Sequence, residues 1–339
     1  PVIFFGVQMI TEYKVSDFCK AARDHGSFTF DVEHLPDLSV TKDGFKLHGV
    51  GLATFDGDEL LCDYVTDLDK AAAIINQLFR DSDVEAIAFN AKYDLKCLVQ
   101  GGIIEPSGYP KNLVDPMVGM NLLDDNRQPQ KLGLKVIVEE IFGHKMASFS
   151  EGSSEGLDSL KFRKYAREDA EWELKLWDWQ RPQLVSQNLL RVLQKIVCPA
   201  VKVFADMEMA GIGWSLKGAR ELLRGYQLLR DELEAEIYSV IGHLNIGSGP
   251  QLAKRLFEEL GYSTRGIGMT PKGDRHSVDA QAMDKLASRY PVCAKIRSWR
   301  YAGKMISTYV EPCTRRALDD RDSRVHPTFW LVSTTGRTR

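Results

Sequence analysis

The chain has 339 residues, of which 44% are hydrophobic and 27% are charged, as expected of a globular protein with two or three domains. No apolar run reaches the roughly 18 residues of a membrane span, and the net charge of −3 excludes a uniformly basic coat for nucleic acid while leaving room for a local basic groove. The six cysteines are widely spaced without a C-x-x-C motif, which predicts reduced thiols in a cytoplasmic protein rather than a zinc site or a disulfide framework.

The first half alternates between strand and helix patterns, with apolar residues at every second position or at spacings of three and four. The segments 46–55 and 60–67 flank the turn sequence DGDE and therefore predict a β-hairpin. The predicted elements are strands at 28–34, 46–55, 60–67 and 85–90, helices at 67–82, 91–102 and 130–145, and a mobile Gly/Ser-rich loop at 149–160. This alternation predicts an α/β domain up to about residue 190.

The second half changes character after residue 190. Residues 214–244 carry apolar side chains at helical spacing, and Ser215 is the expected N-cap of this long helix. A shorter helix follows in SGPQLAKRLFEELGY, with Pro250 in its first turn and Gly261 as its end. The sequence returns to a strand-like pattern only at 324–339, so we expect a mostly α-helical second half.

Two carboxylates interrupt the apolar strand FTFDVEH. Asp31 and Glu33 alternate, so they point to one face about 7 Å apart, where like charges repel. Asp94 follows a short apolar strand, and Asp169 shares a helical face with Tyr165 four residues earlier. We expect the four carboxylates to converge without a Lys or Arg partner, which requires hard cations such as a pair of Mg²⁺ or Mn²⁺ ions.

These residues fall into three motifs: D-x-E on a strand, N-x-x-x-[YF]-D before a helix, and Y-x-x-x-D on a helix. The motif residues are Asp31, Glu33, Asn90, Asp94, Tyr165 and Asp169. Together and in this order, they resemble the DEDD exonucleases in their tyrosine form, and in particular the proofreading domain of family A DNA polymerases, the group of bacterial DNA polymerase I.

The second half extends this resemblance. GPQLAKRLFEELGY, TPKGDRHSVDAQAMDKLA and RYAGKMISTYVEP resemble the polymerase thumb, and VHPTFWLVSTTGRTR looks like the start of the palm. One departure is Ile306, where many relatives carry a lysine. The implied domains are a ribonuclease H-like exonuclease domain at 1–190, a thumb-like helical domain at 191–321 and the first palm strand at 322–339. Motifs of the palm and fingers that bind nucleotide do not occur, so we expect no nucleotide incorporation by these residues.

The resemblance also implies roles for the acidic residues. Asp31 would bridge two Mg²⁺ ions, for which Mn²⁺ substitutes. Glu33 and Asp169 would complete the tighter metal site, and Asp94 would support the second. Tyr165 would orient the attacking water through its hydroxyl group.

DNA is the implied partner at two places. Asn90 and Lys92 would touch the single-stranded 3′ end, and Leu35 would wedge against the terminal base. A primer–template duplex would lie along the thumb and the palm strand, for which the candidate contacts are Lys254, Arg255, Lys272, Arg275, Lys304 and Arg337. The thumb cations are equally compatible with a solvated charged face. The sequence identifies no processivity factor.

The leading hypothesis is a metal-dependent 3′–5′ exonuclease that removes 3′-terminal nucleotides from DNA as monophosphates. It would act in the cytoplasm of a bacterium or of the host of a phage. One alternative is an RNA 3′-end trimming exonuclease of the same superfamily, which shares the tyrosine pattern. The other is a duplex-binding module whose exonuclease site is idle.

Overall fold

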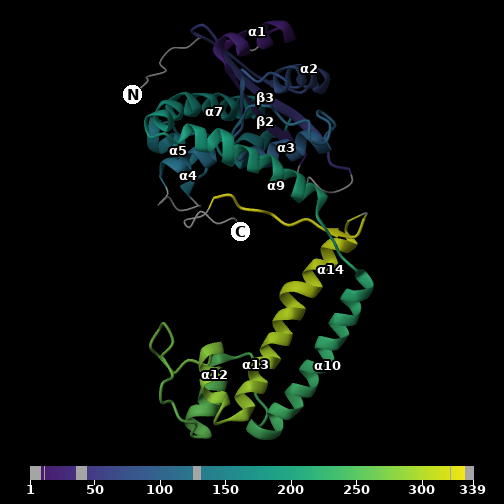
Figure 1. Ribbon diagram of the computed structural model, residues 1–339, viewed down its shortest axis with the longest axis vertical. Helices are drawn as coiled ribbons and strands as arrows, with labels where there is room; N and C mark the ends of the chain where they lie inside the picture. The colour runs from purple at the N-terminus through teal and green to yellow at the C-terminus, as the bar shows by residue number, and fades with distance from the viewer. Residues whose placement is uncertain (1–8, 11, 36–43, 125–130, 321, 333–339) are drawn as a thin grey trace. The chain divides into compact units, whose positions relative to one another are not determined.

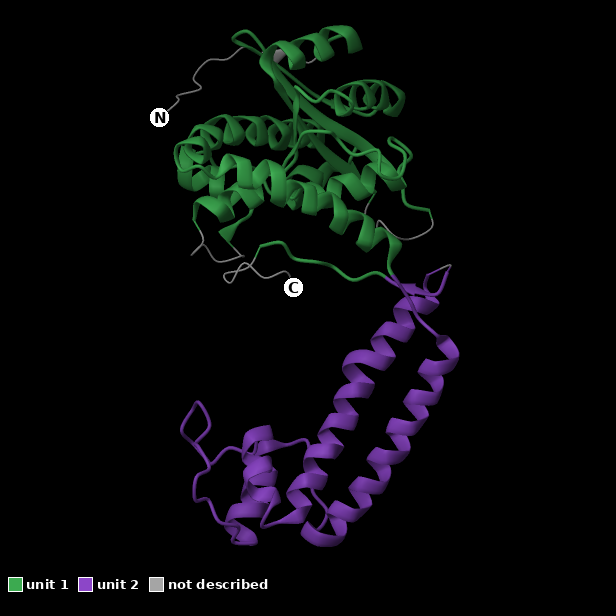
Figure 2. Ribbon diagram, in the orientation of Figure 1, with its two compact units in different colours: residues 1–211, 326–339 green, residues 212–325 purple. Residues whose placement is uncertain are grey.

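The computed structural model describes residues 9–10, 12–35, 44–124, 131–320 and 322–332. The chain forms two compact units, unit 1 with residues 1–211 and 326–339 and unit 2 with residues 212–325 (Figure 2). Among the described residues, no helix is both long and apolar enough to cross a membrane.

Unit 1 is built around a mixed sheet (Figure 1). Its described strands follow the order β1–β4–β3–β2–β5–β6. Strand β3 runs antiparallel to its neighbours β2 and β4, whereas the pairs β1–β4, β2–β5 and β5–β6 are parallel. Their bounds are β1 Met9–Ile10, β2 Ser27–His34, β3 Leu47–Asp56, β4 Glu59–Val65, β5 Glu85–Ile87 and β6 Leu113–Val114. The predicted hairpin and the predicted first strand are confirmed.

Helices surround this sheet, as expected for an α/β domain. They are α1 Val15–His25, α2 Leu68–Phe79, α3 Ala91–Gln100, α4 Pro116–Leu123, α5 Leu134–Phe142, α6 Phe149–Gly152, α7 Leu160–Ser186, α8 Leu190–Val192, the π-helix η3 Leu193–Val197 and α9 Cys198–Ala210. Helix α2 begins at the expected position because the Asp67 carboxylate accepts hydrogen bonds from the amides of Asp69 and Lys70.

The two faces of β2 have different neighbours. Phe28 and Phe30 contact the ring of Phe79 at the end of α2, with ring centroids 6.3 and 5.1 Å away. On the opposite face, the Thr29 hydroxyl donates to the carbonyl oxygen of Ala170 in α7, 2.9 Å away. Side chains alternate along a strand, so Asp31 and Glu33 share the face of Thr29 and point toward α7.

Glycines on β3 let other groups approach the two carboxylates. Gly51 pairs with Asp31, and a Cβ atom there would lie 2.8 Å from the carbonyl oxygen of Ala166 in α7. Gly49 pairs with Glu33, and its Cβ atom would lie 2.7 Å from the ring of Tyr64. Helix α7 therefore packs against bare backbone beside Asp31, which brings its own polar residues close to β2.

The segment 149–160 contains helical turns where the sequence predicted a mobile loop. It forms α6 and the 3₁₀-helix η2 Ser153–Glu155 before α7 begins. Ser148 and Glu151 form a capping box, with the Ser148 amide 2.8 Å from the Glu151 carboxylate. Gly152 is buried against Tyr165, because its Cβ atom would lie 2.6 Å from Cγ of that ring. Serine and glycine serve here as a cap and as a close packing contact, not as flexible residues.

Unit 2 is predominantly helical, as predicted. Its described elements are β7 Ile212–Gly213, α10 Leu216–Ile241, α11 Gly249–Ala253, the π-helix η4 Lys254–Glu259, α12 Ala280–Ala287, α13 Pro291–Lys304, the π-helix η5 Met305–Val310, α14 Glu311–Leu318 and β8 Arg324–Val325. Ser215 caps α10 by accepting a hydrogen bond from the amide of Gly218 at 3.1 Å. The buried core of this unit includes Ile237, Met283 and Ile296.

The unit boundaries differ from the predicted domains 191–321 and 322–339. Residues 191–211 belong to unit 1 because α9 packs against α3. In the described part of 322–339, strand structure is limited to β8, which pairs with β7 inside unit 2. Residues 326–332 return to unit 1, where the Phe329 amide donates to the carboxylate of Glu208.

Candidate active site

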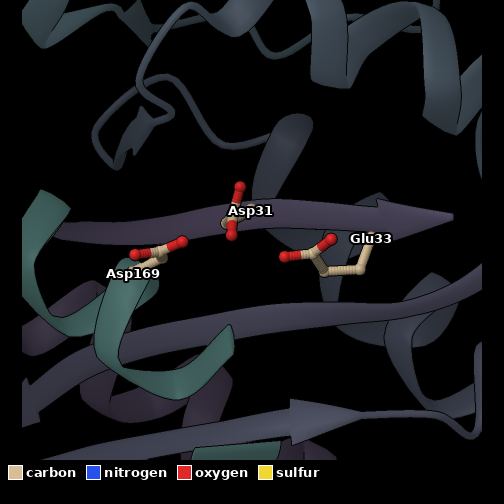
Figure 3. A group of neighbouring side chains, drawn as sticks. All are labelled: Asp31, Glu33 and Asp169. Atoms are coloured by element: carbon tan, nitrogen blue, oxygen red, sulfur yellow. The ribbon is translucent and has the colours of Figure 1, made fainter. Parts of the chain in front are cut away.

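Three of the four candidate carboxylates meet at one point of unit 1. Asp31 and Glu33 project from β2, and Asp169 projects toward them from α7 (Figure 3). One oxygen from each carboxylate lies within 4.8 Å of the others. Asp169 is only 7% exposed, whereas Asp31 and Glu33 are half-buried, so the group lies at the edge of the solvent.

Asp94 approaches the same strand from α3 but does not belong to this group of three. Its Oδ1 atom accepts a hydrogen bond from the Val32 amide at 3.0 Å. Because β5 pairs with β2 only as far as Ile87, the carboxylate takes the place that a strand partner would otherwise occupy. Asp115 fixes the start of α3 by accepting hydrogen bonds from the amides of Asn90 and Ala91, each at 3.0 Å.

Burial and mutual repulsion raise the pKa values of these carboxyl groups. Burial, followed by the charge of Asp169, raises the pKa of Asp31 to about 7. Burial and the charge of Asp31 raise the pKa of Glu33 to about 9. The pKa of Asp94 is raised by burial and by the charge of Asp31, and the pKa of Asp169 is raised mainly by burial. Such shifts indicate that the ionised cluster requires positive charge nearby.

Tyr165 lies one helical turn before Asp169 on α7, which places the two residues on the same face of the helix. Its ring stacks on Phe162, with centroids 5.6 Å apart, and Gly152 covers it from the side. Burial and the charge of Asp169 raise the pKa of the Tyr165 hydroxyl, which therefore stays protonated as a donor. The packing fixes the direction in which this hydroxyl points.

The expectation that the carboxylates have no Lys or Arg partner is wrong. Lys135, in the first turn of α5, places its ammonium nitrogen 3.3 and 3.4 Å from the two oxygens of Asp169. The same group contacts the Ala147 carbonyl oxygen and lies 4.1 Å from the centre of the Tyr165 ring. Sequence patterns missed Lys135 because it reaches Asp169 from a separate helix, 34 residues earlier.

Glu173 is a further acid that the motifs did not include. It is 2% exposed, and its Oε2 atom accepts no hydrogen bond from any described residue. Burial, followed by the charges of Asp31, Asp94 and Asp169, raises the pKa of Glu173 well above its usual range. The spacing of four residues from Asp169 was the available signal, because it places Glu173 on the same helical face.

The three residues predicted to hold a single strand lie in different environments. Asn90 precedes α3 in a left-handed conformation, with φ of 61°, and lines a cavity of about 300 Å³. Leu35 is exposed at the end of β2. Lys92 is buried, and its ammonium group binds the Glu208 carboxylate and the Phe329 carbonyl oxygen. This arrangement argues against the predicted contact between Lys92 and DNA.

The predicted duplex contacts of unit 2 lie on exposed or half-exposed positions. Lys254, Lys272 and Lys304 are exposed. Arg255 pairs with Glu259 at 3.1 Å, and Arg275 pairs with Asp274 at 2.8 Å, so both also have acidic neighbours. Ile306, the departure from the family pattern, is buried in η5. Arg337 lies outside the described residues.

The carboxylate cluster fits divalent cations by its donor chemistry. Mg²⁺ and Mn²⁺ prefer carboxylate oxygens, and the three oxygens within 4.8 Å of one another can face a common ion. The Oδ1 atom of Asp169 is buried and, apart from the Lys135 ammonium nitrogen 3.3 Å away, has no polar partner among the described residues, so it can also face a ligand. Asp31, Glu33 and Asp169 are therefore suited to hold such an ion.

Comparison with known proteins gives two family matches on the two parts of the chain. Residues 7–184 match the model of the 3′-5′ exonuclease family, and residues 219–339 match DNA polymerase family A. The chain is 30% identical to DNA polymerase I of Treponema pallidum over 315 residues, which cover 89% of this chain and 29% of that protein. It is 27% identical to DNA polymerase I of Chloroflexus aurantiacus, covering 95% of this chain and 35% of the relative.

A solved structure shows the same fold. It is described as the POL domain of Pol1 from M. smegmatis in complex with DNA primer-template and dNTP, and it aligns with a TM-score of 0.79 at 19% identity. The alignment covers 98% of this chain and 54% of that one. The chain spans about a third of the length of the curated relatives named above. From these matches and the geometry of its carboxylates, the chain carries a 3′–5′ exonuclease domain and belongs to DNA polymerase family A.

Proposed function

We propose that unit 1 removes nucleotides from the 3′ end of DNA in a metal-dependent hydrolysis and serves as the proofreading site of a DNA polymerase. The observation that carries this proposal is the meeting of Asp31, Glu33 and Asp169 within 4.8 Å beside the hydroxyl of Tyr165. The solved relative bound to primer-template DNA supports DNA as the partner.

The residues have separate parts in this reaction. Asp31, Glu33 and Asp169 would hold the cations, and Asp94 would support the second through its place beside β2. Two bound Mg²⁺ ions would supply a hydroxide nucleophile and stabilise charge on the leaving oxygen. The Tyr165 hydroxyl, one helical turn from Asp169, would orient the attacking water by hydrogen bonding.

Proofreading requires the duplex to be held close to the exonuclease domain, and unit 2 is the candidate for this role. Its exposed lysines Lys254, Lys272 and Lys304 are point charges suited to phosphates, which fix the position of a duplex without reading its sequence. Arg255 and Arg275 would have to exchange their acidic neighbours for phosphate oxygens.

Product analysis distinguishes this proposal from its alternatives. A 5′-labelled single-stranded DNA should be shortened one nucleotide at a time in Mg²⁺, with release of nucleoside monophosphates, and should stay intact in EDTA. A labelled RNA of the same sequence should be degraded more slowly. Degradation in EDTA would contradict the metal requirement, a preference for RNA would favour the RNA-trimming alternative, and no degradation of either would favour an idle site.

Tyr165→Phe should lower the rate of the chemical step about 10²-fold with little change in KM, because the hydroxyl positions water only as the reaction proceeds. Single-turnover degradation of DNA measures this directly. Tyr13→Phe is the matched control, since Tyr13 packs against Phe18 away from the carboxylates. An unchanged single-turnover rate in Tyr165→Phe would leave Tyr165 with a packing role only.

A further inference from the structure

The ammonium group of Lys135 lies beside the Asp169 carboxylate, which would also attract a divalent cation. Its ammonium nitrogen is 3.3 and 3.4 Å from the two oxygens of Asp169, so it contacts both oxygens. The Ala147 carbonyl oxygen and the face of the Tyr165 ring hold the same ammonium group from other sides. The Ala147 carbonyl oxygen and the Tyr165 ring therefore hold the Lys135 ammonium group beside the Asp169 carboxylate.

The charge of Lys135 extends over the whole cluster. It lowers the pKa of Asp31, Glu33 and Asp169, against the upward effects of burial and of the neighbouring acids. In the protein without metal, this ammonium group therefore offsets part of the repulsion among the carboxylates.

We propose that Lys135 is the resident counter-ion of Asp169 and competes with divalent metal for that carboxylate. The inference rests on the proposed function, because it requires metal to bind Asp169. A Mg²⁺ or Mn²⁺ ion binds a carboxylate oxygen at roughly 2.0–2.2 Å. It would then share the oxygens of Asp169 with an ammonium group of like charge. The side chain of Lys135 is 33% exposed, and its flexible stem lets the ammonium group withdraw toward water.

A purely structural role for Lys135 makes the opposite prediction for metal affinity. If its contacts with Ala147 and Tyr165 served mainly to hold Asp169 in a geometry suited to metal, removing the side chain would weaken metal binding. Competition predicts that removing the charge strengthens it. The sign of the change in affinity therefore separates the two roles.

The experiment titrates the full chain with Mn²⁺ alone and follows binding by calorimetry. Lys135→Met should bind Mn²⁺ about tenfold more tightly than the parent protein, because a like charge next to the ion is removed. Lys135→Arg keeps the charge and should stay within about twofold of the parent. Lys164→Met makes the same chemical change at an exposed position of α7 and should also leave the affinity unchanged.

Thermal unfolding provides a second readout that needs no enzymatic activity. In EDTA, Lys135→Met should unfold several degrees below the parent protein, because the carboxylates lose their counter-ion. Saturating Mn²⁺ should narrow this difference, since the variant gains more from binding. If saturating Mn²⁺ leaves the difference in unfolding temperature between Lys135→Met and the parent protein as large as in EDTA, competition between Lys135 and metal is contradicted.

The outcomes separate this inference from the function on which it rests. If the parent binds Mn²⁺, Asp31→Ala abolishes that binding, and Lys135→Met binds equally or more weakly, the role of Lys135 is overturned and the metal site stands. If the parent shows no saturable Mn²⁺ binding, the metal-dependent function fails and the inference fails with it.

Discussion

Asp31→Ala is expected to reduce the rate of 3′-terminal hydrolysis about 10⁴-fold, equivalent to about 5.5 kcal/mol of transition-state stabilisation. Asp31 is placed between Glu33 on its own strand and Asp169 on α7, so it is the carboxylate best placed to be shared by two ions (Figure 3). Its removal would leave two ligands instead of three around the site. Single-turnover degradation of 5′-labelled DNA in Mg²⁺ measures the loss.

Stability measurements separate this chemical effect from misfolding. Burial raises the pKa of Asp31 to about 7, so the folded protein keeps a proton that the unfolded chain releases near pH 4. Stability contributed by this group is therefore lost as pH rises through 7, and at pH 8 in EDTA the alanine variant should unfold at a higher temperature than the parent.

The control for Asp31→Ala is Asp58→Ala in the exposed β3–β4 turn, which should change neither activity nor stability. The metal-ligand assignment fails if Asp31→Ala keeps more than a tenth of the parent activity. It is also weakened if the variant is inactive only because its unfolding temperature has dropped below that of the assay.

Local periodicity predicted the parts of the site that lie on single elements. The alternation of FTFDVEH placed Asp31 and Glu33 on one face of a strand, and the structure shows that this face meets α7. The four-residue spacing of Tyr165 and Asp169 likewise placed them on one helical face. Both conclusions need only the geometry of one regular element.

Groups that reach the site from elsewhere in the chain could not be predicted in the same way. Lys135 meets Asp169 only because α5 packs beside α7, and no pattern within either helix encodes that contact. The glycines of β3 did carry a signal, since glycine in an apolar strand often marks a close approach of backbone. That signal indicates that something packs closely at Gly51, but not that the neighbour is α7.

The same reasoning explains why the burial of Lys92 was not predicted. Its place two residues after Asn90, within the N-x-x-x-[YF]-D motif, made a DNA contact the natural interpretation, because lysine usually points to solvent. Its true partner, Glu208, is 116 residues further along the chain. A buried ion pair between distant helices leaves no periodic pattern in either one.

Glu208→Ala should destabilise unit 1 by about 3–5 kcal/mol, because it leaves two buried ammonium groups without their counter-ion. Glu208 is 1% exposed, and its carboxylate binds the ammonium groups of Lys92 and Lys96, each at 2.5 Å. It also accepts a hydrogen bond from the Phe329 amide at 2.6 Å, so the substitution additionally releases residues 326–332 from α9. Thermal unfolding should show a decrease of about 10 °C in Tm.

The pH dependence of this loss follows from the charge balance. Burial alone would raise the pKa of Glu208, but the hydrogen bonds from Lys92 and Lys96 outweigh it and lower the pKa. A carboxyl group with a lowered pKa contributes stability above the pKa of the unfolded chain and loses it as pH falls through the folded value. The difference between parent and Glu208→Ala should therefore be largest at neutral pH and shrink in acid.

A combined variant tests whether unpaired charge is the cause. If Lys92 and Lys96 are changed to methionine together with Glu208→Ala, no buried charge is left unpaired, and much of the lost stability should return. Glu139→Ala, at an exposed position of α5, controls for the loss of a surface acid and should leave Tm unchanged. If the triple variant is no more stable than Glu208→Ala alone, the loss comes from missing packing and from the freed Phe329 amide, and the three-residue charge cluster is not what holds α3 and α9 together.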